Sequence, residues 1–542
     1  MFCYQCEQAS NGIGCNMQGV CGKTPNVAIL QDLLIYALKG LSFLVTEAKK
    51  SPMDLDSIDL FICEGLFATV TNVDFDEQCI LALITRAIEL RDSLLEFLKN
   101  KKFNLADLPD AVTFELGENM QEVLQQGKEH NVIDKQEKDP DIQSLKSTVL
   151  FGIKGIAAYV DHASILNQTD PLIFSFIQKA LASMLYYNLS LNDWLSMAME
   201  CGQVNLRTME LLDKGHNENY GHPIPTQVLL GAKQGKAILV SGHDLKDLDM
   251  LLKQTEGKNI YIYTHGEMLP AHGYPKLKQY KHFAGHFGTA WQNQYQEFGE
   301  FPGAILMTTN CIQRPAKIYE KNIFTTGLVA WPNVTHIGKN KDFTPVIEKA
   351  LALPGFAADV DHGHVNVGFG HDTVLSIAGK IVDMVQSGKV RRFFLVAGCD
   401  GAKPGRNYYT EIVDKIPTDC MVLTLACGKF RFFDKNLGEI DGIPRLLDIG
   451  QCNDAYSAVK IAGALADVLQ CDINALPLSF VLSWYEQKAV AILLTLLSLG
   501  IKNIKLGPSM PAFITPNVLQ ILVDKFNIKS ITTPDKDLQD ML

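Results

Sequence analysis

The distribution of apolar residues divides the chain into a helical part and two α/β parts. From about residue 26 to 215, apolar side chains recur at helical spacing in long segments such as QDLLIYALKGLSFLVTEAKK and DEQCILALITRAIELRDSLLEFLKN, which predicts a bundle of helices. The polar stretch GENMQEVLQQGKEHNVIDKQEKDPDIQS interrupts them and predicts a solvated loop or an exposed helix face. HNENYGHPIPTQV, with Pro223 and Pro225, predicts a linker after the bundle.

Beyond this linker, short apolar strands alternate with helices, a pattern typical of parallel sheets in an α/β architecture. A second boundary is predicted near GFAADVDHGHVNVGFGHDT, between about 355 and 373. The predicted fold is therefore multidomain α and α/β: an N-terminal helical bundle followed by two α/β domains with mainly parallel sheets. We expect the domains to span 1–218, 219–365 and 366–542.

Size and charge limit the classes of function. The chain has 542 residues, of which 47% are hydrophobic and 20% charged, enough for several domains with full cores. A net charge of -11 argues against a nucleic-acid surface. The longest uncharged apolar run, AVAILLTLLSLGI, is shorter than the roughly 20 residues that span a bilayer, and no secretory signal precedes the first cysteines. We expect a cytoplasmic protein with no membrane and no nucleic-acid partner.

Four of the 13 cysteines, Cys3, Cys6, Cys15 and Cys21, lie in the first 21 residues. Clustered thiols in a reducing compartment are more often metal ligands or redox groups than disulfides. Glycines between and beside them allow the backbone to wrap closely around a compact group. Spacing alone leaves three possibilities open, an iron–sulfur cluster, a structural zinc ion and free thiols.

Seven further side chains of metal-ligating type follow predicted strands directly. They are, in chain order, His243 (in KAILVSGHD), Glu267 (in NIYIYTHGE), Cys311 (in GAILMTTNC), Cys399 (in RRFFLVAGC), Cys427 (in MVLTLAC), Cys452 (in RLLDIGQC) and Glu486 (in LSFVLSWYE). In open α/β sheets, ligands bind outside the carboxyl ends of the strands. We therefore expect these seven side chains to converge between the two sheets.

Each of these residues also has an ordinary structural interpretation. A lone cysteine beside a strand is usually a small buried hydrophobe. His243 could cap the helix that follows it, and Glu267 and Glu486 could be first-turn carboxylates favoured by the helix dipole. Taken together, the mixed soft and hard ligands favour an iron site with oxygen-type bridges or open positions, which can bind a small oxygen-bearing substrate and pass it electrons.

The residues outside these two groups carry weaker signals. Lys488, two residues after Glu486, could donate a proton at the site or could face solvent at a helix start. His362 and His364 are expected in a surface loop, and GFG at 368–370 starts no dinucleotide fingerprint, so no NAD or flavin is expected. Packing roles are assigned to the five remaining cysteines, Cys63, Cys79, Cys201, Cys420 and Cys471.

The motifs taken together resemble those of the hybrid cluster proteins, also called prismane proteins or hydroxylamine reductases, along the whole chain. The resemblance is carried by MFCYQC, GVCGKT, QDLLIYALKG, SGHDL, HGEMLPAHGYP, TTNCI, AGCDGAKPGRNYYTE, ACGKFRF, DIGQCNDAYSA and SWYEQKAV. It implies a three-domain protein with two metal centres. Cys3, Cys6, Cys15 and Cys21 match the ligands of the subgroup with short spacing, which carries a [4Fe-4S] cluster.

The same resemblance implies a hybrid [4Fe-2S-2O] type cluster held by His243, Glu267, Cys311, Cys399, Cys427, Cys452 and Glu486, with Cys399 as a persulfide. The implied activity is reduction of hydroxylamine to ammonia and water with electrons from an external donor protein. Glu486, Lys488, Glu267 and Tyr485 are the expected catalytic residues. Three alternatives stay open: reduction of nitric oxide to nitrous oxide, a mediator of protein nitrosylation or redox exchange, and a zinc-stapled helical protein with an unrelated α/β body.

Overall fold

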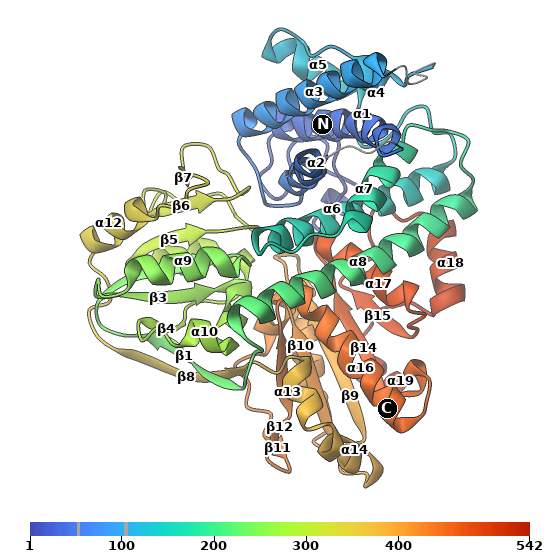
Figure 1. Cartoon of the computed structure of the whole chain (residues 1–542). Helices are drawn as coiled ribbons and strands as arrows, with labels where there is room; N and C mark the ends of the chain where they lie inside the picture. Colours follow the sequence, from blue (N-terminus) through green and yellow to red (C-terminus); the bar gives the residue numbers. More distant parts are fainter. Residues whose placement is uncertain (51–54, 102–106) are drawn as a thin grey trace.

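A computed structural model describes residues 1–50, 55–101 and 107–542. They form a helical part and two parts built on β-sheets (Figure 1). The helical part contains α1 (Pro25–Ala48), α2 (Asp56–Ala68), α3 (Glu77–Asn100), α4 (Asp110–Thr113), α5 (Met120–Glu129), α6 (Pro140–Ile165), α7 (Pro171–Ser183) and α8 (Leu191–Tyr220). The predicted bundle is confirmed, and the polar stretch at 117–144 contains α5, a loop and the start of α6.

The starts of several of these helices follow one local rule. A Thr or Asp side chain caps the first turn, and a proline occupies the first helical position of α1, α6 and α7. The cap satisfies a free backbone N–H, and proline needs no hydrogen-bond acceptor there. At α8, Ser190 and Asp193 form a reciprocal capping box. The sequence therefore fixes where these helices begin.

Helix α1 is, by length and composition, the one helix in the described ranges that is long and apolar enough to cross a membrane. Inside the protein, however, 78% of its apolar window is buried. It packs against α3 and α7, and its apolar side chains belong to the main core. Its composition is thus accounted for by burial.

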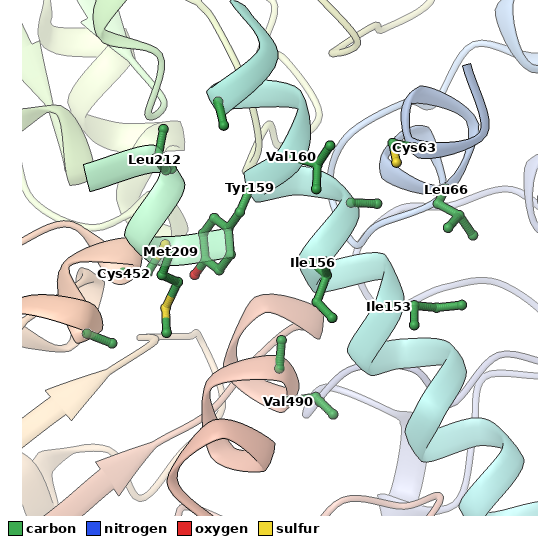
Figure 2. Packing of buried hydrophobic residues seen from close by; sticks show 14 of the residues in the cluster. Cys63, Leu66, Ile153, Ile156, Tyr159, Val160, Met209, Leu212, Cys452 and Val490 are labelled. Atoms are coloured by element: carbon green, nitrogen blue, oxygen red, sulfur yellow. The ribbon is translucent and has the colours of Figure 1, made fainter. Parts of the chain in front are cut away.

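Helix α6 lies at the centre of this core. Figure 2 shows its side chains Ile153, Ile156 and Val160 between α2, α8 and α17 (Gln487–Ser498). Because α17 comes from the last part of the chain, this packing joins segments that are far apart in sequence. The Tyr159 ring, also on α6, lies beside Cys452. The helical part therefore reaches the sheet that carries Cys452.

The first sheet has eight strands in the order β7-β6-β5-β2-β3-β4-β1-β8. All neighbours are parallel except β1 and β8. The strands are β1 (Thr226–Ala232), β2 (Lys236–Ser241), β3 (Ile260–His265), β4 (Phe283–His286), β5 (Ala304–Met307), β6 (Ile323–Thr326), β7 (Thr335–Ile337) and β8 (Val360–Val367), with helices α9 (Leu245–Thr255), α10 (Pro275–Lys278), α11 (Gln294–Glu300) and α12 (Thr344–Ala352).

The second sheet has six parallel strands in the order β13-β10-β9-β14-β15-β16. They are β9 (Arg392–Gly398), β10 (Cys420–Leu425), β13 (Leu446–Gly450), β14 (Leu478–Ser483), β15 (Ile504–Gly507) and β16 (Lys529–Ser530); β11 (Glu439–Ile440) and β12 (Ile443–Pro444) form a separate hairpin. The other helices here are α13 (His371–Ser376), α14 (Ala378–Gln386), α15 (Asn407–Lys415), α16 (Ala455–Leu469), α18 (Pro516–Phe526) and α19 (Pro534–Met541). The predicted fold class, with mainly parallel sheets, is confirmed.

Two details of the sequence interpretation are wrong. The predicted linker HNENYGHPIPTQV is mostly regular structure, because α8 continues to Tyr220 and β1 begins at Thr226. His362 and His364 are exposed as expected, but they lie on the edge strand β8 and not in a loop. The domain limits 1–218, 219–365 and 366–542 stay a prediction; β8 itself ends at Val367.

Candidate metal centre

The seven predicted ligands all lie just beyond the carboxyl ends of parallel strands. The first sheet carries His243 after β2, Glu267 after β3 and Cys311 after β5, and the second carries Cys399 after β9, Cys427 after β10, Cys452 after β13 and Glu486 after β14. All but Cys311 are buried, and Cys311 is half-buried. Loops at this edge of a parallel sheet are free of ladder bonds and can point side chains into a common crevice.

A sharp backbone turn precedes several of these ligands. The residue before His243, Glu267, Cys399 and Cys427 has a positive φ in each case: Gly242, Gly266, Gly398 and Ala426. At Gly398, φ is +109°, and a Cβ atom would lie 2.0 Å from the Ser483 carbonyl oxygen. Only glycine fits this close approach of β9 to β14. The turn thus ends the strand and presents Cys399 at the sheet edge.

One cavity collects most of these side chains. Its lining includes His243, Glu267, Cys311, Cys399, Cys427 and Glu486. The seventh residue, Cys452, has a ligand atom within 4.8 Å of those of His243 and Glu267. The Cys452 N–H donates to Glu267 Oε2 at 2.8 Å, and His243 Nε2 lies 3.3 Å from that oxygen. The structure thus brings the predicted set together across the two sheets.

Lys488 is buried at this cavity, so the solvent-facing interpretation is wrong. Its Nζ donates to Asn310 Oδ1 at 2.9 Å, and it lies 3.2 Å from His243 Nε2 and 3.7 Å from Glu486 Oε1. The idea that His243 caps a helix is also wrong, because Asp244 caps α9. Glu486, in contrast, caps α17 by accepting the Lys488 N–H at 2.9 Å.

Burial and neighbouring charges shape the protonation of these groups. Burial raises the pKa of Cys399 to about 12 and raises the pKa of Cys427 well above its usual range. Burial opposes the charged forms of Glu267 and Lys488 too. The His243 ring and the cation of Lys488 nevertheless hold the pKa of Glu267 low, and the neighbouring acidic groups of Cys452 and Glu486 raise the pKa of Lys488.

The donor set fits a positively charged metal cluster. Thiols bind metal only as thiolates, and burial keeps these thiols protonated unless a cation lies beside them. Lys488 supplies one positive charge to a cavity lined by three cysteines and two carboxylates. The mixture of sulfur, nitrogen and oxygen donors suits iron.

Several residues of the cavity escaped the sequence interpretation. Ser241 Oγ lies 2.9 Å from His265 Nδ1, and His265 Nε2 lies 2.9 Å from Glu297 Oε2. Ser241 and His265 line the cavity, while Glu297 is only partly buried. Trp291 and Asn310 also line it. Ser241 and His265 each lie two residues before a predicted ligand, and this spacing is the sequence feature from which their place in the cavity could have been predicted.

The four N-terminal cysteines lie together in the loop before α1. Cys3 and Cys15 form a two-bond bridge between backbones, with N···O distances of 2.9 and 2.8 Å. Cys6 and Cys15 are buried, and Cys3 and Cys21 are half-buried. Burial raises the pKa of Cys6, and repulsion from the neighbouring thiol groups of Cys21 and Cys3 raises it further. The four thiols therefore form a second candidate site.

Tyr485 links the two candidate sites. The Glu7 N–H, next to Cys6, donates to the Tyr485 carbonyl oxygen at 2.9 Å. The Tyr485 ring stacks on Trp291 with centroids 4.4 Å apart, and its hydroxyl donates to Asn72 Oδ1 at 2.8 Å. Burial raises the pKa of Tyr485, and the next contributions come from Cys6 and Cys311. This residue therefore lies between the N-terminal thiols and the buried cavity.

An apolar cavity lies on the other side of Cys399 and Cys452. It is enclosed by aliphatic and aromatic side chains of the second sheet and of α16 and α17, among them Leu425, Phe480 and Leu493. An apolar cavity admits small uncharged molecules more readily than ions. Both cysteines thus line an apolar space, and Cys399 lines the polar cavity as well.

The remaining cysteines lie away from both sites. Cys63, Cys201 and Cys420 are buried, as expected for packing roles, and Cys471 is half-buried. Cys79 is exposed on α3, so its packing assignment is wrong. It occupies the solvent face of an amphipathic helix, next to the buried Ile80.

Comparisons with known proteins cover the whole chain. Residues 1–539 match the model of the family described as Prismane/CO dehydrogenase. A protein named hydroxylamine reductase from Syntrophobacter fumaroxidans is 60% identical, and one of the same name from Methanocella arvoryzae is 58% identical, with 100% of both chains covered in each case.

Solved structures of carbon monoxide dehydrogenases share the fold. Carbon monoxide dehydrogenase IV from Carboxydothermus hydrogenoformans matches with a TM-score of 0.57 and 15% identity, covering 99% of this chain and 91% of that one. The enzyme from Thermococcus sp. AM4 gives a TM-score of 0.56 and 16% identity, covering 99% and 89%. At this identity, the likeness concerns the fold alone.

Proposed function

The chain belongs to the Prismane/CO dehydrogenase family, and from that premise we propose that it is a hydroxylamine reductase, which converts hydroxylamine, two electrons and two protons into ammonia and water. The resemblance deduced from the motifs is confirmed at the level of the family, and relatives across the full chain carry this name. Membership also implies iron–sulfur clusters. Their number and types are part of the proposal.

The two groups of ligands fit two clusters. We assign a [4Fe-4S] cluster to Cys3, Cys6, Cys15 and Cys21. In the buried site, we assign Cys399 as a persulfide. A hybrid [4Fe-2S-2O] type cluster would be held by His243, Glu267, Cys311, Cys399, Cys427, Cys452 and Glu486. The support is the convergence of all seven side chains from two sheets, which ordinary packing does not require. Such a cluster supplies electrons and open coordination positions for a small substrate.

Lys488 is the residue best placed to hold a proton for the leaving oxygen. Its Nζ is fixed by Asn310 and lies within reach of His243 and Glu486. Neighbouring anions raise its pKa, so it carries its proton at neutral pH. A general acid must lie within hydrogen-bond reach of the atom it protonates. Glu267 is held as an anion and is better suited to binding than to donating.

Tyr485 has a different role in this proposal. Its hydroxyl is engaged with Asn72, and its ring packs on Trp291 between the two thiol sites. We infer that it holds the N-terminal loop against the buried cavity and is not the proton donor. An external electron donor protein completes the reaction, and a cytoplasmic location fits a reduced set of thiols.

The decisive experiment counts iron and acid-labile sulfide per chain in protein purified without oxygen, beside hydroxylamine consumption with reduced methyl viologen. We expect about eight irons in the wild type and about four in the Cys427→Ala/Cys452→Ala variant, which should be inactive. The matched control is Cys63→Ala/Cys201→Ala, two buried cysteines outside both sites. A wild type with about four irons that does not consume hydroxylamine would refute the proposal.

The apolar cavity behind Cys399 and Cys452 supports a second candidate, reduction of nitric oxide to nitrous oxide. Nitric oxide is small and uncharged and suits an apolar route, whereas hydroxylamine is polar. Leu425→Trp would narrow this cavity, and Leu425 does not itself line the polar one. A selective loss of nitric oxide turnover, with hydroxylamine turnover retained, would favour this candidate; equal rates of both reactions in variant and wild type would count against it.

A further inference from the structure

The surface of the N-terminal loop is unusual in its composition. Residues 8–22 contain no Asp, Glu, Lys, Arg or His, although 20% of the chain is charged. Three large apolar side chains project from this segment, Ile13 with 70% of its surface exposed, Met17 with 82% and Val20 with 59%. We call these three residues the apolar rim. Met17 is the most exposed large hydrophobic side chain in the described part of the chain.

The charged residues that flank this segment in sequence are buried, and the nearest partly exposed charge that contacts them is Lys403, 3.4 Å from Glu7 Oε1. Glu7 and Lys23 flank it, and both are buried. Glu7 pairs with Arg406 at 3.0 Å, and the Lys23 ammonium is bonded to Gln31. Residues 8–22 themselves therefore offer an uncharged surface on a protein with a net charge of -11. Clusters of exposed apolar side chains on soluble proteins commonly mark interaction sites.

Backbone hydrogen bonds fix the conformation of the loop that carries the apolar rim. The Ile13 N–H donates to the Ser10 carbonyl at 3.0 Å, the Gly19 N–H to the Lys23 carbonyl at 2.9 Å, and Cys15 is bridged to Cys3. These bonds prevent the loop from folding its apolar side chains inward. The exposure is thus built into the backbone.

The rim residues alternate with the thiols along the loop. Ile13 and Met17 flank the buried Cys15 by two residues on either side, and Val20 adjoins Cys21. At Gly19, a Cβ atom would lie 3.0 Å from the Cys21 sulfur, so the Gly19 backbone lies close to this thiol. The rim is thus part of the same short loop that carries the thiols.

We propose that the apolar rim is the docking surface for a ferredoxin-type one-electron carrier protein whose face around its redox group is apolar and uncharged. This inference rests on the proposed function, which requires electrons from outside and a cluster at these four thiols. Complementarity here means a lack of charge, because the rim offers nothing for a charged face to pair with. Exposed Met and Ile side chains supply adaptable apolar contacts.

The test compares two electron donors. The rim variant is Ile13→Ser/Met17→Gln/Val20→Ser, and the matched control is Leu172→Ser/Ile318→Ser/Val468→Ser, which removes side chains that are 61%, 72% and 58% exposed elsewhere. Hydroxylamine consumption is measured with reduced methyl viologen and with a reduced two-cluster ferredoxin, alongside iron content. We expect the rim variant to raise KM for ferredoxin about tenfold, with an unchanged rate from methyl viologen, while the control behaves as wild type.

Other outcomes overturn the docking proposal. These are an unchanged KM for ferredoxin in the rim variant, a wild type that accepts no electrons from ferredoxin, or a ferredoxin rate that falls steeply with salt, which would indicate a charged interface. A wild-type dimer that the rim variant splits, with ferredoxin kinetics unchanged, would assign the rim to a second copy of the chain instead.

The failure of the docking proposal can be told apart from a failure of the proposed function. If wild-type protein consumes no hydroxylamine with methyl viologen, the proposed function falls, whatever the rim does. Docking is then judged from the dissociation constant for ferredoxin in a direct titration. The rim variant must weaken that constant about tenfold and the control variant must not.

Discussion

Cys3, Cys6, Cys15 and Cys21 lie on one loop near the surface, whereas the proposed ligands of the buried site are spread from His243 to Glu486 and come from both sheets. The loop site needs only local backbone bonds and a few contacts below it. The buried site exists only when the two sheets and α17 are packed together. The same element, sulfur, is thus presented by local chain geometry in one place and by the tertiary fold in the other.

The largest effect is expected from removing the ion pair that joins the loop to the second sheet, because this pair makes the loop site depend on a tertiary contact. Arg406 donates to Glu7, Ser483 and the Trp484 carbonyl. Arg406 and Glu7, the two charged residues of this pair, are both buried. Arg406→Met leaves the Glu7 carboxylate with the half-exposed Lys403, 3.4 Å away, as its charged partner, and we expect the free energy of unfolding to fall by about 3 kcal/mol. Chemical denaturation measures this.

The control for this variant is Arg406→Met/Glu7→Gln. Removing the second charge should restore a large part of the lost stability, because position 7 is then neutral and the buried Asp400 keeps Arg431 as its partner. If the double variant is as unstable as the single one, the loss comes from packing and the anchor is not electrostatic.

A second test concerns the one ammonium group of the buried site, Lys488. Lys488→Met should lower kcat at least about 100-fold, or about 2.7 kcal/mol, because a positioned general acid contributes that much. Iron content should remain that of the wild type. Lys488→Arg, which keeps the charge, should retain more activity. A kcat within twofold of the wild type in the methionine variant would exclude Lys488 as the donor.

The independence of the two sites is tested by Cys6→Ala/Cys21→Ala. Loss of the loop cluster should lower iron from about eight to about four per chain and leave the spectrum of the buried centre in place. Because methyl viologen is small, we expect its rate to fall only about tenfold, or about 1.4 kcal/mol. Loss of all iron would show that the buried site depends on the loop.

The smallest effect is expected at Cys79. This thiol is exposed on α3 and lies outside both sites. Cys79→Ser should leave iron content, turnover and the unfolding free energy within about 0.5 kcal/mol of the wild type. A measurable loss of iron in this variant would mean that an exposed thiol takes part in cluster assembly.

The contrast also explains what the sequence could predict. Alternating strands and helices place His243 or Cys399 at strand ends from local pattern alone, and parallel sheets bring such ends to one edge. The burial of Lys488 could not be read in this way, since a lysine at a helix start is usually solvated. Its position depends on Asn310, which is far away in sequence.

The errors have local causes. Cys79 follows the helical pattern of its neighbours, but the residue type gave no sign of which helix face it would occupy. Polar and histidine-rich composition suggested a loop for His362, whereas pairing with β1 forms the edge strand β8. An edge strand exposes one side of its ladder, so its composition resembles that of a loop.

The hydrogen bond from Glu7 to Tyr485 also bears on the order in which the two sites can form during translation. Chains emerge from the ribosome from the N-terminus onward, so the four loop thiols are available for most of the time of translation. Tyr485, which accepts the hydrogen bond from this loop, and Glu486, the last proposed ligand of the buried site, are consecutive residues. Tyr485, which the loop contacts, and Glu486, which completes the proposed ligand set, are therefore added in successive steps of elongation, late in the synthesis of the chain.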